Sequence, residues 1–197
     1  MISAGLLAAG IGLLGLGALH RLPAADDFDR RTGLGLQGYL KSRPWITLFR
    51  LTWPLGRSEF SMLAVIALTV YNLGAGASAA AAYVAWAFID RFIKVGFKRI
   101  RPFDRQPAAD MLQPRRPHDP SFPSGDAFHA WFLAVTAIQV FHLPALPALA
   151  LGLLAAWVSL GRIALGVHYP LDVIAGAGVG LVAAAFEFFL MGYFRPV

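Results

Sequence analysis

The chain has 197 residues, of which 57% are hydrophobic and only 14% are charged. Soluble domains carry about a quarter charged residues, so this composition excludes an ordinary soluble domain. The formal net charge is +6, but the basic residues gather at the edges of apolar stretches, which argues against a nucleic-acid-binding surface. The absence of cysteine excludes disulfides and thiolate metal sites.

Long apolar stretches separated by short polar segments predict an all-α, polytopic membrane helical bundle, built by residues 1–197 as a single membrane domain. The first stretch has no basic residue before it and Arg21 after it. We therefore expect a retained helix with its N-terminus outside, rather than a cleaved signal peptide. In all we expect about six transmembrane helices, in the ranges 2–19, 60–73, 78–93, 124–142, 148–164 and 171–193.

The segment 21–59, after the first apolar stretch, mixes charged residues with leucine and aromatic side chains. It is too polar to span a membrane and too apolar to lie free in water. An interfacial helix or two, held by aromatic and basic anchors, fits this composition. Two roles stay open: the segment guides a lipid head group, or it is a plain membrane anchor.

Two further segments complete the polar parts of the chain. Residues 74–77 (Gly-Ala-Gly-Ala) separate the second and third apolar stretches, and we expect a tight turn there. Near the end of the third stretch, Asp90 and Lys94 are four residues apart and can pair on one helix face. The following residues, 97–123, contain repeated prolines, which predict an irregular loop.

Six spanning helices bring the polar segments 21–59, 97–123 and 166–170 to the same face of the membrane. Of the 17 Lys and Arg residues, only Arg195 falls clearly on the opposite face. The positive-inside rule then places the polar face in the cytoplasm, for a multi-pass protein of the inner (plasma) membrane. Basic residues that hold a substrate also enter this count, although they do not report on the orientation.

Polar residues that a plain membrane bundle does not need lie at each boundary of this face. Ser124 is a good helix N-cap, and Gly125 allows close approach to the backbone, so the helix start there presents free N–H groups to an anion. The basic residues before it suggest that this anion is a phosphate. The three groups are Lys94 with Arg101-Pro102, then Ser124, Gly125 and Asp126, and finally Arg162, His168 and Asp172.

His168 and Asp172 lie one helical turn apart if the last helix begins near Pro170. A carboxylate that accepts from one histidine nitrogen orients the ring and makes the other nitrogen more basic, which suits attack on phosphorus. Arginine and lysine side chains can hold the charge of the transition state. A lone histidine or arginine at a membrane edge is usually interfacial, but the joint arrangement on one face favours a site.

The arrangement resembles the type 2 phosphatidic acid phosphatase (PAP2) superfamily, in its membrane lipid phosphatase branch. That family reads Lys, six residues, Arg-Pro; then Pro-Ser-Gly-His; then Ser-Arg, five residues, His, three residues, Asp. Gly161 stands where the third motif has its serine. The resemblance implies no metal, no cofactor and a lipid phosphate substrate. It implies a phosphohistidine on His168, oriented by Asp172, with a phosphate held at Lys94, Arg101, Pro102, Ser124, Gly125 and Arg162.

Asp126 stands where the second motif has the histidine that protonates the leaving oxygen. Three outcomes stay open. Asp126 serves as the acid, or His129, three residues on and near the same helix face, replaces it. Alternatively no strong acid is needed, because the leaving group is itself a phosphate. The last outcome favours a lipid diphosphate, such as undecaprenyl or another polyprenyl diphosphate, over a phosphatidic acid.

The leading prediction is a metal-independent lipid phosphatase or diphosphatase. The same chemistry with an alcohol in place of water would make a lipid phosphotransferase. A non-catalytic lipid-phosphate binding or carrier protein is the alternative class, and its support is Asp126 and Gly161. A channel or transporter fits poorly, because the polar residues gather at one face and not at the midplane. The oligomeric state is not predicted.

Overall fold

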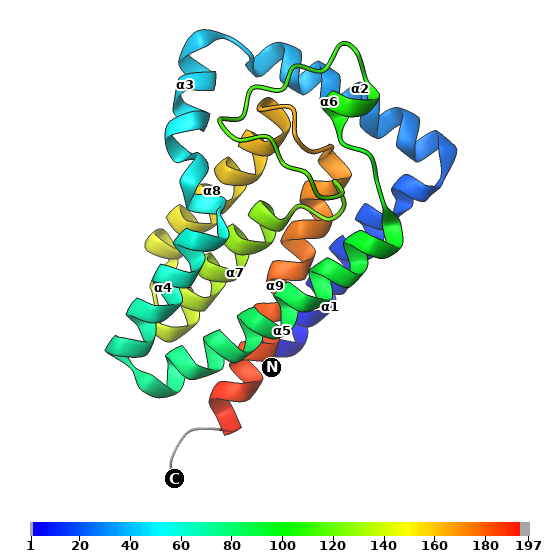
Figure 1. Cartoon of the computed structure of the whole chain (residues 1–197). Coiled ribbons are helices and arrows are strands. Elements are labelled where there is room, and N and C mark those ends of the chain that lie inside the picture. The colour runs from blue at the N-terminus through cyan, green and yellow to red at the C-terminus, as the bar shows by residue number, and fades with distance from the viewer. Residues whose placement is uncertain (1, 194–197) are drawn as a thin grey trace.

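Helices make up most of the computed structural model, which describes residues 2–193 (Figure 1). Arg195, on which the orientation prediction partly rests, lies outside the described residues. The elements are α1 (Ile2–Ala18), η1 (Leu19–Arg21), α2 (Pro23–Leu40), α3 (Arg43–Thr52), η2 (Trp53–Gly56), α4 (Ser58–Tyr71), α5 (Leu73–Phe97), α6 (Pro102–Arg105), α7 (Gly125–Val140), α8 (Ala145–Ala164) and α9 (Pro170–Tyr193).

The prediction of an all-α membrane bundle is confirmed. Within the described residues, four helical segments are long and apolar enough to cross a bilayer: Ala4–Arg21, Leu73–Arg105, Ala145–Ala164 and Pro170–Gly192. Helices α4 and α7 have 14 and 16 residues and fall short of the roughly 20 that a perpendicular span needs. The count of six spans and the single domain therefore stay predictions.

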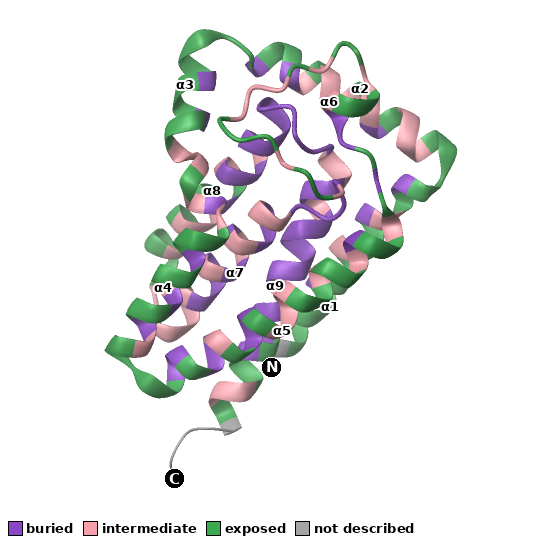
Figure 2. Ribbon diagram, in the orientation of Figure 1, coloured by how far each residue is buried: buried purple, intermediate pink, exposed green. Residues whose placement is uncertain are grey.

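Helix α9 is the centre of the bundle, packed by α1, α5 and α7. In its apolar window 72% of the residues are buried, against 17% in that of α1, and Figure 2 shows α9 largely purple. Glycines permit this close packing. A Cβ on Gly178 would lie 2.6 Å from the main-chain oxygen of Gly10 in α1, and one on Gly176 would lie 2.3 Å from that of Ser124.

The turn between α4 and α5 is not where the glycine run predicts it. Helix α4 ends at Tyr71, and Asn72 caps α5 by accepting a hydrogen bond from the main-chain N–H of Ala75 (3.0 Å). The Gly-Ala-Gly-Ala prediction is therefore wrong. Its Gly76 serves helix crossing instead, because a Cβ there would lie 2.1 Å from the Cα of Thr69 in α4.

Residues 21–59 form the short helices α2 and α3, which lie at the end of the bundle opposite both chain termini (Figure 1). Helix α3 packs on α8 through Phe49, whose ring stacks on that of Trp157 with centroids 4.4 Å apart. The prediction of one or two helices in this segment is confirmed, while their place at the membrane surface stays a prediction. The segment 97–123, predicted to be irregular, is so apart from the end of α5 at Phe97 and the short helix α6.

Candidate active site

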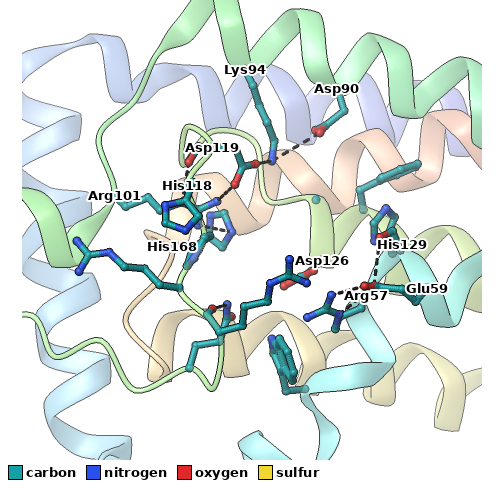
Figure 3. Close-up of a pocket in the computed structure, with 18 of the residues that line it drawn as sticks. Arg57, Glu59, Asp90, Lys94, Arg101, His118, Asp119, Asp126, His129 and His168 are labelled. Atoms are coloured by element: carbon teal, nitrogen blue, oxygen red, sulfur yellow. Dashed lines mark hydrogen bonds and ion pairs between the residues drawn. The ribbon is translucent and has the colours of Figure 1, made fainter.

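A polar cavity of about 350 Å³ opens at the end of the bundle that carries α2, α3 and the long loop (Figure 3). Six of the residues singled out from the sequence line it: Lys94, Arg101, Gly125, Asp126, His129 and His168. The other four, Pro102, Ser124, Arg162 and Asp172, are buried outside its lining. The structure thus gathers the three predicted groups at one place, and in each group some residues line the cavity while others are buried outside its lining.

His168 lies in the tight connection between α8 and α9 and is 4% exposed. Its Nε2 lies 3.2 Å from Nη1 of Arg101, which has only protons to offer. The ring proton therefore sits on Nδ1, which faces Oδ2 of Asp172 at 3.6 Å. Burial, followed by the positive charge of Arg101, lowers the pKa of His168 to about 4. The ring is neutral at pH 7, and the lone pair of Nε2 accepts from Arg101 at the edge of the cavity.

Asp172 is fully buried in the first turn of α9 and does more than face His168. It accepts hydrogen bonds from Arg99 Nη1 (2.7 Å), from Ser121 Oγ (2.5 Å) and from the main-chain N–H of Tyr169, three residues earlier (2.9 Å). Ser121 Oγ also lies 3.4 Å from His168 Nδ1. The histidine is thus held by a carboxylate that three other donors keep in place.

Arg99 connects α2 to this carboxylate. It is 5% exposed and pairs with Asp26 (3.0 Å), Asp29 (2.8 Å) and Asp172 (2.7 Å). Asp29 also accepts from the main-chain N–H of Leu171 at the start of α9. Because a buried charge is tolerated when it is paired, these contacts fix α2 across the N-terminal end of α9.

Lys94 and Arg101 meet at one carboxylate on the loop. Asp119 Oδ2 lies 2.5 Å from Lys94 Nζ, and its Oδ1 lies 2.8 Å from Arg101 Nη2. The predicted pair of Lys94 with Asp90 is also present, at 3.7 Å. Nothing in the local sequence marks Asp119, because it lies in a proline-rich loop and reaches both cations through long-range folding.

The start of α7 is a helix N-terminus capped by Ser124, as predicted. Ser124 caps the helix by accepting from the N–H of Ala127 (3.4 Å), and it does not line the cavity. Gly125 does line the cavity, and a Cβ there would lie 3.7 Å from Lys94 Nζ. The space in front of the helix N-terminus is therefore shared with a cation.

Asp126 and Arg162 form an ion pair on the opposite side of the cavity. Asp126 Oδ2 lies 3.0 Å from Arg162 Nη1. Arg162 is 1% exposed and also donates to the main-chain oxygen of Trp53 (2.9 Å). Asp126 thus lies between the guanidinium and the cavity, and Arg162 does not reach the cavity itself.

His129 lies on the same side, near Arg57 and Glu59 (Figure 3). Its Nδ1 donates to the main-chain oxygen of Gly56 (2.9 Å), which leaves Nε2 as the acceptor for the hydroxyl of Tyr83 at 3.4 Å. Both ring nitrogens are engaged, so neither carries a proton directed at the space beside His168.

A sequence profile of the PAP2 superfamily matches residues 59–196. The chain belongs to the PAP2 superfamily. A comparison with curated proteins finds no match.

Two solved structures share the PAP2 membrane fold. The transmembrane PAP2-type phosphatidylglycerolphosphate phosphatase of Bacillus subtilis superposes with a TM-score of 0.75 at 22% identity, covering 96% of this chain and 98% of that one. LpxE of Aquifex aeolicus superposes with a TM-score of 0.70 at 24% identity, covering 79% and 92%. At such identities the likeness shows the fold alone, and with the apolar helices it shows a multi-pass membrane protein.

The PAP2 pattern and the structure agree best around His168. Sequence reasoning missed Asp119 and Ser121, and it marked Arg99 only as one basic residue among several. It also missed His118, an exposed loop residue that lines the cavity (Figure 3). Among residues 2–193 no group of three or more His, Asp or Glu side chains is placed to hold a metal ion. That the site works without a metal stays a prediction.

Proposed function

We propose that this PAP2 protein is a metal-independent lipid phosphatase that forms a phosphohistidine on His168. The observation that carries the proposal is the buried His168 ring, with Nε2 beside Arg101 and Nδ1 backed by Asp172, in a cavity lined by cations. A neutral imidazole with a lone pair on one nitrogen is a nucleophile. Lys94 and Arg101 are placed to hold a phosphate against it.

In the proposed reaction, Nε2 of His168 attacks phosphorus and the bond from phosphorus to the leaving oxygen breaks. The ring becomes positively charged, and the buried carboxylate of Asp172 stabilises that charge across 3.6 Å. Lys94 and Arg101 stabilise the charge on the equatorial oxygens. Water then attacks the phosphohistidine, which releases inorganic phosphate and returns the neutral ring.

We further propose a lipid diphosphate, such as a polyprenyl diphosphate, as the preferred substrate. Asp126 is paired with Arg162, and both nitrogens of His129 are engaged. Neither group is poised to protonate a leaving oxygen. A phosphate leaves without that help far more readily than a lipid alkoxide does, so the engagement of both candidate acids supports a diphosphate.

An apolar groove supports the lipid part of the proposal. It measures about 510 Å³, within the usual range of ligand pockets, and lies between α4, α7 and α8. Leu55 and Phe60 line it, while Arg57 and Glu59, from the same stretch of chain, line the polar cavity. We assign the groove to the hydrocarbon tail of the substrate.

We propose that the protein lies in the inner (plasma) membrane with this end in the cytoplasm. The support is the gathering of Lys and Arg in the segments that form the polar end. Reporter fusions after Val197 test this orientation. Activity of a C-terminal reporter that functions only in the cytoplasm would contradict this orientation.

The test of function is phosphate release by the detergent-purified protein in EDTA. The substrates are a polyprenyl diphosphate, a polyprenyl monophosphate and phosphatidic acid, each with wild type and His168→Ala. We expect release from the diphosphate above all, lost in His168→Ala. Wild type that binds the lipid but releases nothing would instead identify a carrier, and phosphate recovered on an added alcohol would identify a phosphotransferase.

A further inference from the structure

Asp119 occupies the space between the two cations assigned to the substrate phosphate. Its two carboxylate oxygens bind different partners, Oδ2 with Lys94 Nζ at 2.5 Å and Oδ1 with Arg101 Nη2 at 2.8 Å (Figure 3). A phosphate also offers separate oxygens to separate cations. The carboxylate therefore makes the contacts expected of two phosphate oxygens, beside His168.

The negative charge of Asp119 decides how these contacts affect an incoming phosphate. Burial would raise the pKa of Asp119, but Lys94 and then Arg101 lower it, and the cations prevail, so the carboxylate is ionised throughout the physiological range. Asp90 contributes a second carboxylate 3.7 Å from Lys94. A phosphate that enters this space meets cations that are already neutralised and a like charge at contact distance.

The backbone around Asp119 is held independently of its carboxylate. Its main-chain oxygen accepts from Arg101 Nε (2.8 Å), and the N–H of Ser121 donates to the main-chain oxygen of Arg99 (2.8 Å). The side chain itself is 50% exposed. Rotation about the side-chain bonds can thus carry the carboxylate into solvent while the loop keeps its place.

We propose that Asp119 is an internal competitor of the substrate: its carboxylate holds Lys94 and Arg101 in the empty site and rotates out when a phosphate binds. The inference rests on the proposed function, because it takes Lys94 and Arg101 as the phosphate site. It goes beyond that function, since it makes Asp119 a determinant of phosphate affinity. A weakly charged phosphate ester displaces the carboxylate less well than a diphosphate does.

The opposite role would be that Asp119 stays in place and positions the two cations for the phosphate. The two roles predict effects of opposite sign. Removal of a competitor strengthens phosphate binding, whereas removal of a positioning group weakens it. The sign of the change therefore decides between them.

The experiment measures binding of inorganic phosphate by calorimetry to the full-length protein in detergent. The variants are Asp119→Asn and Asp119→Ala, which both remove the charge and differ in hydrogen bonding. We expect each to bind phosphate about tenfold more tightly than wild type, the order of one ion pair to a partly buried group. The KM for the lipid diphosphate should fall in step.

Asp110→Asn is the matched control, because Asp110 lies on the same loop, has the same charge and a similar exposure, and pairs with Lys41, which does not line the cavity. We expect its phosphate affinity to equal that of wild type. Unchanged or weaker binding in both Asp119 variants, with thermal unfolding like that of wild type, overturns the proposal. An equal gain in Asp110→Asn also overturns it, since a general charge effect then explains the result.

Failure of this inference is distinguishable from failure of the proposed function. If wild type releases phosphate from lipid and the release is lost in His168→Ala, the function stands whatever the Asp119 variants show. If wild type releases no phosphate from any lipid, and neither it nor the Asp119 variants bind phosphate, both ideas fall together.

Discussion

The two sides of the polar cavity differ in how deeply their polar groups are buried and how extensively they are bonded to one another. On the side of α5, the loop and α9, His168, Asp172, Arg99 and Ser121 form a continuous buried network. On the side of α4, α7 and α8, Asp126 pairs with Arg162, and its partly exposed carboxylate lines the cavity.

The first side keeps the complete PAP2 pattern and the second departs from it. Attack on phosphorus needs an oriented nucleophile and fixed cations, and the first side supplies both. Departure of the leaving group needs a proton only when the leaving oxygen is a poor leaving group. Under the proposed function, the groups that attack phosphorus match the PAP2 pattern, and the departure from it lies on the side of the leaving group.

The largest expected effect separates the two histidines. His168→Ala removes the nucleophile and should lower kcat for lipid phosphate release by at least about 10³-fold. His129→Ala should lower it by less than about tenfold, because its ring donates to Gly56 and not to substrate. Both variants should still bind inorganic phosphate. Comparable losses in the two would contradict the division between the sides.

A gain of function tests the second side. Asp126→His places an imidazole where the PAP2 pattern has its acid, and a general acid contributes about 10² to 10⁴. Since Arg162 then loses its carboxylate, we expect a gain at or below the bottom of that range, about tenfold to 10²-fold faster release from phosphatidic acid. Release from a polyprenyl diphosphate should change less than about threefold.

Asp126→Asn serves as the control for that variant, because it removes the charge without supplying an imidazole. Its turnover of phosphatidic acid should stay at or below the wild-type level. If Asp126→Asn instead abolishes release from both substrates, Asp126 is itself the acid and the argument for a diphosphate fails.

The predictability of the molecule follows the same division. Lys94, Arg101 and His168 could be found from the sequence, because fixed spacing and helix periodicity bring each to the end of a helix at one face. Ser124 could be identified as a cap by its local chemistry. These features depend on residues close together in the chain.

The missed features depend on contacts between distant segments. Asp119 reaches Lys94 across 25 positions and Arg101 across 18, and a proline-rich loop has no periodicity to reveal such contacts. Arg162 fits the motif, yet it points to Asp126 and Trp53 instead of the cavity. The turn at Asn72 was missed because the glycines after it suggest a break, whereas they allow two helices to cross.

The pH profile tests the nucleophilic side more finely. The pKa of His168 is lowered to about 4, so the nucleophile stays neutral, and kcat/KM for the diphosphate should persist through pH 6.5 and fall by half only near pH 4. Between these values the unfolded chain binds a proton at this histidine and the folded protein does not, so stability should decline as the pH falls. A half-loss of kcat/KM near pH 6.5 in both wild type and Asp126→Asn would contradict the buried, neutral ring.

The smallest expected effect concerns the apolar groove beside the variable side. Ala137 on α7 lines it, and Ala137→Phe should fill part of the space assigned to the lipid tail. We expect a threefold to tenfold rise in KM for a long-chain diphosphate, roughly the worth of a few methylene contacts, and no change for a short-chain, water-soluble diphosphate. Ala150→Phe, on an exposed face of α8, controls for added bulk. An equal rise for both chain lengths would place the tail elsewhere, and the leaving-group side would then recognise the substrate by its phosphates alone.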